Sequence, residues 1–203
     1  IMKIAFAAAA REPVVVHVDS DLAFVRPFDA SRFFDAGRPR FFRVTGEAPP
    51  SSFHAQAFAA ATRLLGLDPG AVAYVNHVGS VIPWNTALVR AMIERIEAVG
   101  GRPWPSLLLR TPVIAEYMLY GVFCEHVLGL EDAGLALDDV GFCETVWSDA
   151  QLPDPYAVLG LLQDRQIALG LQSTLGLTLA ERLDVLNRAD PREGIAFRSR
   201  LAG

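Results

Sequence analysis

The chain has 203 residues, of which 52% are hydrophobic and 20% charged, and its formal net charge is −5. This length and apolarity are enough for a sizeable core, and they exclude disorder as the dominant state. The negative charge disfavours non-specific binding to nucleic acids. No apolar run approaches the roughly 20 residues that cross a bilayer, and no signal-peptide pattern stands at the start. We therefore expect a cytoplasmic protein with no transmembrane segment and no nucleic-acid partner.

Helical and extended patterns alternate along the chain, judged by apolar periodicity and by end signals such as Asn85, an N-cap, and Thr178 with Glu181, a capping box. In chain order we expect a helix over residues 1–11, a strand at 14–18, a short helix at 31–35, a strand at 40–44, a helix over 55–66, a strand at 72–75, a loop over 76–83, helices over 85–99 and 113–128, a strand at 140–147, a helix over 156–166, a strand at 167–171 and a helix over 178–187. This alternation predicts a single α/β domain over residues 1–203. Its expected architecture is a sandwich with a mostly parallel central sheet flanked by helices.

The most informative feature is the acidic pair Asp19 and Asp21, which directly follows the strand expected at residues 14–18. In open α/β sheets, ligands gather at the carboxyl ends of the strands. Two carboxylates one residue apart on a turn can face one cation, and Mg²⁺ or Mn²⁺ completes its shell with water and substrate phosphate. The pattern therefore predicts a divalent metal that supports chemistry at a phosphate-bearing substrate. The alternative is a solvated turn, in which Asp and Ser hydrogen-bond to their own backbone.

Two classes of enzyme carry such a pair at a strand end. Phosphatases with a nucleophilic aspartate have Thr or Val two positions after the second aspartate, where this chain has Ala23. They also need a cation downstream, usually lysine, whereas the only lysine here is Lys3, upstream of the pair. Glycosyltransferases of the GT-A type use the pair to hold an ion that bridges the two phosphates of a nucleotide-sugar donor. A non-catalytic binding module of the same fold is a third alternative.

The stretch from Val16 to Asp29, VHVDSDLAFVRPFD, resembles the GT-A motif. It is most similar to a bacterial family of uncharacterised glycosyltransferases, whose members follow the motif with Val-Arg-Pro. Further segments share the resemblance: GRPR at 37–40, LLGL at 64–67, VRA at 89–91, RIE at 95–97, AEYMLYG at 115–121 and LQST at 171–174. The resemblance implies a GT-A-like fold, a Mn²⁺ or Mg²⁺ cofactor, and transfer of a sugar from a nucleotide-diphosphate sugar to a glycan or other hydroxyl acceptor.

The GT-A fold normally begins with strand–helix–strand elements that bind the nucleotide, well before the acidic pair. Only 18 residues precede Asp19 in this chain. We therefore expect these N-terminal nucleotide-binding elements to be missing from the chain and the intact protein to continue upstream. The expected consequence is weak donor binding by this segment alone.

An inverting glycosyl transfer needs a carboxylate that takes the proton of the acceptor hydroxyl. Glu116 is the candidate base, with Glu144 and Asp154 as alternatives. Tyr117 and Tyr120 follow Glu116 at a spacing that places both on one helical patch, where aromatic rings can meet the apolar faces of a sugar. The competing interpretation makes Glu116 a first-turn residue stabilised by the helix dipole and leaves both tyrosines half buried.

Five more residues are candidates for substrate binding. The resemblance implies that the loop with His77 helps to line the acceptor side together with Trp84, which lies just after the loop, although Trp84 can equally be a core aromatic. Arg26 is the arginine closest to the acidic pair, and a guanidinium group recognises phosphate with two parallel hydrogen bonds. Gln172 and Ser173 follow the last expected strand, so we expect them at the same edge of the sheet as the acidic pair.

Overall fold

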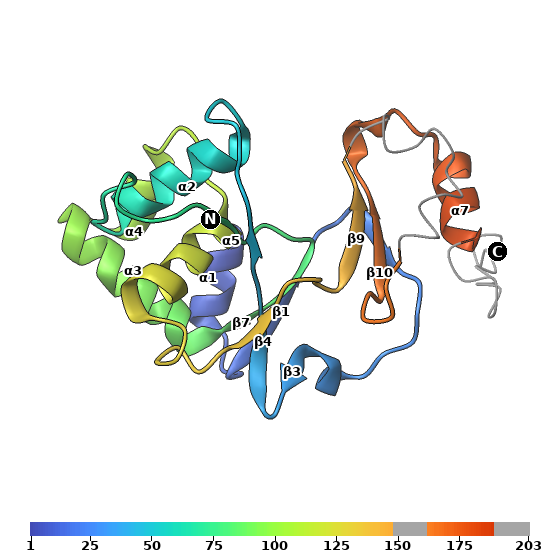
Figure 1. Ribbon diagram of the computed structural model, residues 1–203, viewed down its shortest axis with the longest axis horizontal. Helices are drawn as coiled ribbons and strands as arrows, with labels where there is room; N and C mark the ends of the chain where they lie inside the picture. Colours follow the sequence, from blue (N-terminus) through green and yellow to red (C-terminus); the bar gives the residue numbers. More distant parts are fainter. Residues whose placement is uncertain (148–161, 189–203) are drawn as a thin grey trace. The chain divides into compact units, whose positions relative to one another are not determined.

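The computed structural model describes residues 1–147 and 162–188 (Figure 1). The chain divides into two compact units. Unit 1 consists of Ile1–His17 and Ala30–Asp139, and unit 2 consists of Val18–Asp29 and the chain from Val140 onward. Two compact units can belong to one domain, so the single domain expected from the sequence stays a prediction.

Unit 1 combines helices with short strands. Its helical elements are α1 (Met2–Ala9), the 3₁₀ turn η1 (Ala30–Phe33), α2 (Phe53–Leu64), α3 (Thr86–Gly100), α4 (Trp104–Leu109), α5 (Glu116–Val122) and the π-helix η2 (Phe123–Leu128). Its strands are β1 (Val14–Val18, the last residue of which belongs to unit 2), β3 (Phe34–Asp35), β4 (Arg38–Phe42), β5 (Val44–Thr45), β6 (Val75–Asn76), β7 (Val81–Asn85) and β8 (Ala136–Asp138). The helices α1 to α5 cluster together beside β1, β4 and β7 (Figure 1).

The strands of unit 1 form small sheets. β1 pairs with β7, and β5 pairs antiparallel with β6. β4 lies between β3, to which it is antiparallel, and β8, to which it is parallel. The pairing of β1 with β7 brings the first strand of the chain next to the segment that leads into α3.

One hydrophobic core holds the helices of unit 1 together. The alanine-rich sequence of α1 favours a helix, and this helix buries Ile4 and Ala7. Trp84 of β7 belongs to the same core and is 0% exposed. Asn85 caps α3, because its side chain accepts hydrogen bonds from two backbone N–H groups of the first turn at 2.9 and 3.3 Å. At the other end of α3, Gly101 takes a left-handed conformation with φ 62°.

Unit 2 is a three-stranded sheet with a helix. β10 (Ala168–Leu171) lies between β2 (Leu22–Phe24), which is antiparallel to it, and β9 (Cys143–Val146), which is parallel. The 3₁₀ turn η4 (Ser173–Leu175) follows β10, and α7 (Leu179–Arg188) comes next. The apolar core of the unit is formed by Val25, Val146, Leu162, Leu169, Leu171, Leu175 and Val185.

The α/β class expected from the sequence is confirmed, and several local predictions are confirmed with it. The strand expected at residues 14–18 is β1. The capping box forms at the start of α7: the backbone N–H of Thr178 donates to Glu181 Oε2 at 2.7 Å, and the N–H of Glu181 donates to Thr178 Oγ1 at 3.3 Å. The mostly parallel central sheet is not seen among the described strands, which form small sheets: two of three strands, both mixed, and two of two strands.

Other elements differ from the expectation. β7 forms where a loop was expected, α4 was not expected at all, and the strand expected at 72–75 is reduced to β6. The helix expected at 113–128 begins only at Glu116 and changes to a π-helix at Phe123. Of the helix expected at 156–166, the first six positions lie outside the described residues and the rest form no helix. Within the described ranges, no helix is both long and apolar enough to cross a membrane.

Candidate functional site

The Asp-Ser-Asp sequence forms the turn that leads from β1 into β2, and both aspartates are partly exposed. The backbone carbonyl of Asp21 accepts a hydrogen bond from the N–H of Leu171 at 2.9 Å. Its carboxylate Oδ2 accepts one from the N–H of Ser173 at 3.4 Å. Because β2 runs antiparallel to β10, these two bonds hold the acidic turn at the carboxyl end of β10. The structure thus brings Asp21 and Ser173 together at one edge of the sheet.

Asp19 lies within electrostatic reach of β9. Burial raises the pKa of the Cys143 thiol to about 12, a hydrogen bond with Thr145 opposes this rise, and the charges of Glu144 and Asp19 add to it. The thiol therefore stays protonated at neutral pH and adds no thiolate to the acidic turn. The anionic metal ligands at this edge of the sheet are therefore carboxylate oxygens.

A cavity of about 560 Å³ lies beside the acidic turn, within unit 2. Its polar lining consists of Ser20, Asp21, Ser173 and Arg182, and Asp19 is not part of it. The remaining lining is apolar, and we call it the leucine wall: Leu22, Leu169, Leu171, Leu177, Leu179, Leu183 and Leu186. A side chain that could ligate a metal ion therefore borders a space with predominantly hydrocarbon walls.

Arg182 of α7 fixes one side of this cavity. Its Nη1 and Nη2 atoms donate to the backbone carbonyls of Leu171 and Gln172 at 2.5 and 2.9 Å. Its Nε donates to the carbonyl of Leu177 at 3.3 Å. Since all three nitrogens bond to backbone oxygens, the guanidinium group ties α7 to the end of β10 and offers no complete fork to a phosphate. Arg182 is not among the residues predicted from the sequence, because no local pattern shows which carbonyls its side chain reaches.

Arg26 also bonds to its own chain. Its Nη1 donates to the carbonyls of Gln163 and Gln166 at 2.5 and 3.0 Å, and its Nη2 lies 3.5 Å from the carbonyl of Leu162. These bonds connect the end of β2 to the segment that precedes β10. Gln166 in turn donates to Glu144 Oε2 at 2.9 Å, so this alternative base is held within unit 2. The predicted phosphate contact of Arg26 stays a prediction, and the bonds present favour a structural role.

Four of the substrate-binding candidates lie in unit 1 and are buried: His77, Trp84, Tyr117 and Tyr120. Trp84, Tyr117 and Tyr120 are 0%, 6% and 1% exposed. The rings of Trp84 and Tyr120 stack with centroids 4.9 Å apart, and the Tyr120 hydroxyl accepts a hydrogen bond from the backbone N–H of Asn85 at 3.1 Å. Burial raises the pKa of Tyr120 well above its usual value. The structure therefore matches the alternative in which Trp84 is a core aromatic, and the tyrosines present no sugar-binding face to solvent.

His77 belongs to a buried polar network of unit 1. Its Nδ1 lies 3.2 Å from the carbonyl oxygen of Phe42, and its Nε2 lies 3.5 Å from Glu125 Oε2. Arg43 donates to both carboxylate oxygens of Glu125 at 2.7 to 3.0 Å. Burial lowers the pKa of His77 to about 4, against the opposing effects of the Phe42 carbonyl and the Glu125 charge. The imidazole is therefore neutral at pH 7 and is surrounded by protein groups.

Glu116, the predicted base, is the first residue of α5 in unit 1. Its side chain is partly buried. Burial acts to raise the pKa of this carboxyl, and the charge of Lys3 acts to lower it. The other alternative base, Asp154, lies outside the described residues.

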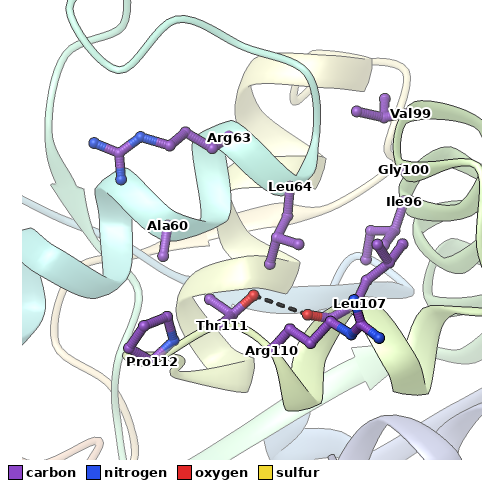
Figure 2. A pocket seen from close by; sticks show the side chains of 10 residues that line it. All are labelled: Ala60, Arg63, Leu64, Ile96, Val99, Gly100, Leu107, Arg110, Thr111 and Pro112. Atoms are coloured by element: carbon purple, nitrogen blue, oxygen red, sulfur yellow. Dashed lines mark hydrogen bonds between the residues drawn. The ribbon is translucent and has the colours of Figure 1, made fainter.

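Unit 1 has a cavity of its own, of about 310 Å³, between α2, α3 and α4 (Figure 2). Apolar side chains such as Leu64 and Ile96 line it, and Thr111 at its edge donates a hydrogen bond to the carbonyl of Leu107 at 3.0 Å. Figure 2 shows the side chain of Arg63 turned away from Leu64. None of the residues predicted for the site lines this cavity.

The acidic turn offers a divalent ion two carboxylates, those of Asp19 and Asp21. Within residues 1–147 and 162–188, no three side chains of His, Cys, Asp or Glu are grouped so that they could hold a metal ion. Two carboxylates still fit Mg²⁺ or Mn²⁺, because these ions often take one or two carboxylates and fill the remaining positions with water and phosphate oxygens. Partial exposure of both aspartates leaves room for such a shell.

Comparison with known proteins adds a family but no activity. Residues 1–143 match DUF6492, a family of unknown function. Because the match covers more than half of the chain, this α/β protein belongs to that family. The matched part includes the Asp-Ser-Asp turn and ends before β10 and α7. No curated protein matches the chain.

Proposed function

We propose that the chain is part of a metal-dependent glycosyltransferase of the GT-A type, which transfers a sugar from a nucleotide-diphosphate sugar to a glycan or other hydroxyl acceptor. The observation that carries the proposal is the attachment of the acidic turn to the carboxyl end of β10 by the two hydrogen bonds of Asp21. That edge is where ligands gather in open α/β sheets. The resemblance of residues 16–29 to the GT-A motif of a bacterial family supports the same conclusion.

Asp19 and Asp21 are the residues that hold Mn²⁺ or Mg²⁺ in this proposal. The metal supplies charge that stabilises a diphosphate leaving group. The backbone N–H of Ser173 orients the Asp21 carboxylate, and Gln172 and Ser173 lie at the same sheet edge. Arg26 and Arg182 bond to backbone carbonyls, so in this proposal Asp19 and Asp21 act on the diphosphate through the ion that they would hold.

In the proposed reaction, the oxygen of the acceptor hydroxyl forms a bond to the anomeric carbon of the donor sugar. The bond between that carbon and the phosphate oxygen breaks, and its electron pair leaves with the nucleoside diphosphate. The hydroxyl proton passes to a carboxylate base. The candidates for this base stay those predicted from the sequence, Glu116 of unit 1 and, as its alternative, Glu144 of unit 2.

Metal binding tests the first step of the proposal. We expect Mn²⁺ titrations followed by electron paramagnetic resonance to show a site whose Kd rises at least about tenfold in Asp19→Asn and in Asp21→Asn. Asp132→Asn is the matched control, because Asp132 is an exposed aspartate in a turn of unit 1. Equal Mn²⁺ affinity in wild type and Asp21→Asn would contradict the proposal.

Turnover tests the second step. The protein, with any upstream residues of the intact chain included, is incubated with a panel of nucleotide sugars and Mn²⁺. Release of nucleoside diphosphate supports the glycosyltransferase. Release of phosphate from a simple phosphomonoester instead supports the aspartate-nucleophile phosphatase. Metal binding without either reaction supports a non-catalytic module.

A further inference from the structure

The cavity beside Asp21 has a chemistry that a sugar or a nucleotide does not explain. We propose that it binds the hydrocarbon chain of an amphipathic acceptor, so that the hydroxyl to be glycosylated belongs to a lipid-like glycoside. This inference rests on the proposed glycosyl transfer and names the class of its acceptor. The proposed binding site for the hydrocarbon chain is the space in unit 2 between Asp21 and the leucine wall.

The size and lining of the cavity support an apolar ligand. At about 560 Å³, it falls within the range of roughly 300–1,000 Å³ that is typical of small-molecule pockets. Such pockets have mostly apolar walls with a few placed polar groups, which here are Ser20, Asp21, Ser173 and Arg182. Burying a hydrocarbon chain against the leucine wall removes apolar surface from water, which is favourable for the ligand and for the protein.

The charges of the cavity disfavour a ligand that is anionic throughout. Asp21 contributes a negative charge, and the one cation in the lining, Arg182, has all three nitrogens bonded to backbone carbonyls. Arg182 keeps its positive charge, but its nitrogens are bonded to these carbonyls, so an anion placed among the leucines would lose its hydration without gaining the paired hydrogen bonds of a free guanidinium group. A neutral chain avoids this cost while its polar end lies at the acidic turn.

Helix α7 carries unburied apolar surface at the rim of the cavity. Leu179, Leu183 and Leu186 recur at helical spacing and all line the cavity. Leu179 is nevertheless 72% exposed. The acidic turn borders the same space through Asp21, so the apolar surface continues directly into the proposed metal site. A ligand with a polar head at the turn and a chain along α7 matches this arrangement.

The experiment compares n-octyl β-D-glucopyranoside, kept below its micelle concentration, with methyl β-D-glucopyranoside by ligand-observed NMR in the presence of Mn²⁺. The two probes share one sugar and differ in the alkyl chain. We expect the octyl compound to bind at least about tenfold more tightly, since each buried methylene favours binding. Leu179→Gln and Leu183→Gln are expected to reduce that preference severalfold. Leu109→Gln is the matched control, because Leu109 of α4 is 76% exposed in unit 1.

The outcomes separate this inference from the proposed function. Mn²⁺ affinity that depends on Asp21, combined with no preference for the octyl compound, overturns the lipid-like acceptor alone. A preference for the octyl compound that depends on the leucines, without Mn²⁺ affinity, supports the hydrocarbon site and overturns the glycosyltransferase. Sedimentation velocity of the same variants gives a further check. A dimer that Leu179→Gln abolishes, without any alkyl preference, shows that the leucine wall binds a second copy and overturns the inference.

Discussion

The carboxylate of Asp21 and the backbone N–H of Ser173 form a hydrogen bond of 3.4 Å between residues 152 positions apart in the sequence. With the 2.9 Å bond from the N–H of Leu171 to the carbonyl of Asp21, it fixes the acidic turn to the end of β10. The orientation of the proposed metal ligand therefore depends on a backbone group of η4. This dependence can be tested without altering either aspartate.

Ser173→Pro removes the N–H that orients Asp21. Proline is tolerated at the first position of a helical turn, and Gln172 already has the extended conformation that a following proline requires, with φ −51° and ψ 138°. We expect the fold to persist and the Kd for Mn²⁺ to rise roughly two- to fivefold, which corresponds to about 0.5–1 kcal/mol for a long hydrogen bond to a charged group. Ser173→Ala keeps the N–H and is expected to bind Mn²⁺ as the wild type does. A metal affinity that falls equally in both variants would show that the hydroxyl is what matters.

Arg182→Gln tests the attachment of α7 to the sheet. The substitution removes charged hydrogen bonds to the carbonyls of Leu171, Gln172 and Leu177. We expect a loss of about 1–3 kcal/mol in the free energy of unfolding, measured with urea. Arg110→Gln, at an exposed position in unit 1, is expected to change stability by less than about 0.5 kcal/mol. Equal stability of the two variants would contradict this prediction. It would mean that water hydrogen-bonds to the carbonyls of Leu171, Gln172 and Leu177 as favourably as Arg182 does.

Gly121→Ala tests the close contact between α5 and His77. A Cβ atom at residue 121 would lie 2.1 Å from His77 Cγ, closer than any real contact. The buried ring or the helix must shift, and such overpacking typically costs about 1–3 kcal/mol. Gly46→Ala is the control, since nothing lies within 4 Å of its added Cβ. Thermal unfolding of the two variants is expected to show a lowered Tm for Gly121→Ala alone.

The features that the sequence predicted well are those decided by near neighbours. The strand β1, the N-cap Asn85 and the capping box of Thr178 and Glu181 depend on residues a few positions away. β7 was missed because Pro83 argues against a strand. Among the described residues, β7 pairs with β1 in a two-stranded sheet, and proline is tolerated in such an edge strand. α4 had an available signal, because a proline opens its first turn, as is common at helix starts.

The candidate site was only partly predictable, because its contacts are distant in sequence. The turn could be located from its strand, but its bond to Ser173 spans 152 positions and the pairing of Arg43 with Glu125 spans 82. Neither of these two contacts produces a pattern among neighbouring residues of the sequence. The burial of Tyr117 and Tyr120 did leave one, because residues 117–122 are apolar all round the helix and are buried throughout. That pattern favours a core helix over a surface patch for sugars.

The pH dependence of stability is expected to carry a contribution from His77. Burial lowers the pKa of this imidazole to about 4, whereas its value in the unfolded chain is near 6.5. Between these values the unfolded state binds more protons than the folded state, so the free energy of unfolding falls as the pH falls from about 6.5 to 4. The full effect of such a shift is about 3 kcal/mol. Glu125, which faces the ring, acts against this shift, while Arg43 and His126 act with it.

Urea unfolding at pH 7 and at pH 4.5 measures this contribution in wild type and in His77→Asn. The variant loses stability at both pH values, because the buried ring is removed, but its loss between pH 7 and 4.5 is expected to be smaller than that of the wild type by about 1–3 kcal/mol. His54 has a pKa that burial lowers as well, but it is less buried, so His54→Asn is expected to change the pH dependence less. Identical pH dependence of wild type and His77→Asn would show that water reaches the imidazole and that the Arg43–Glu125–His77 network opens before the chain unfolds.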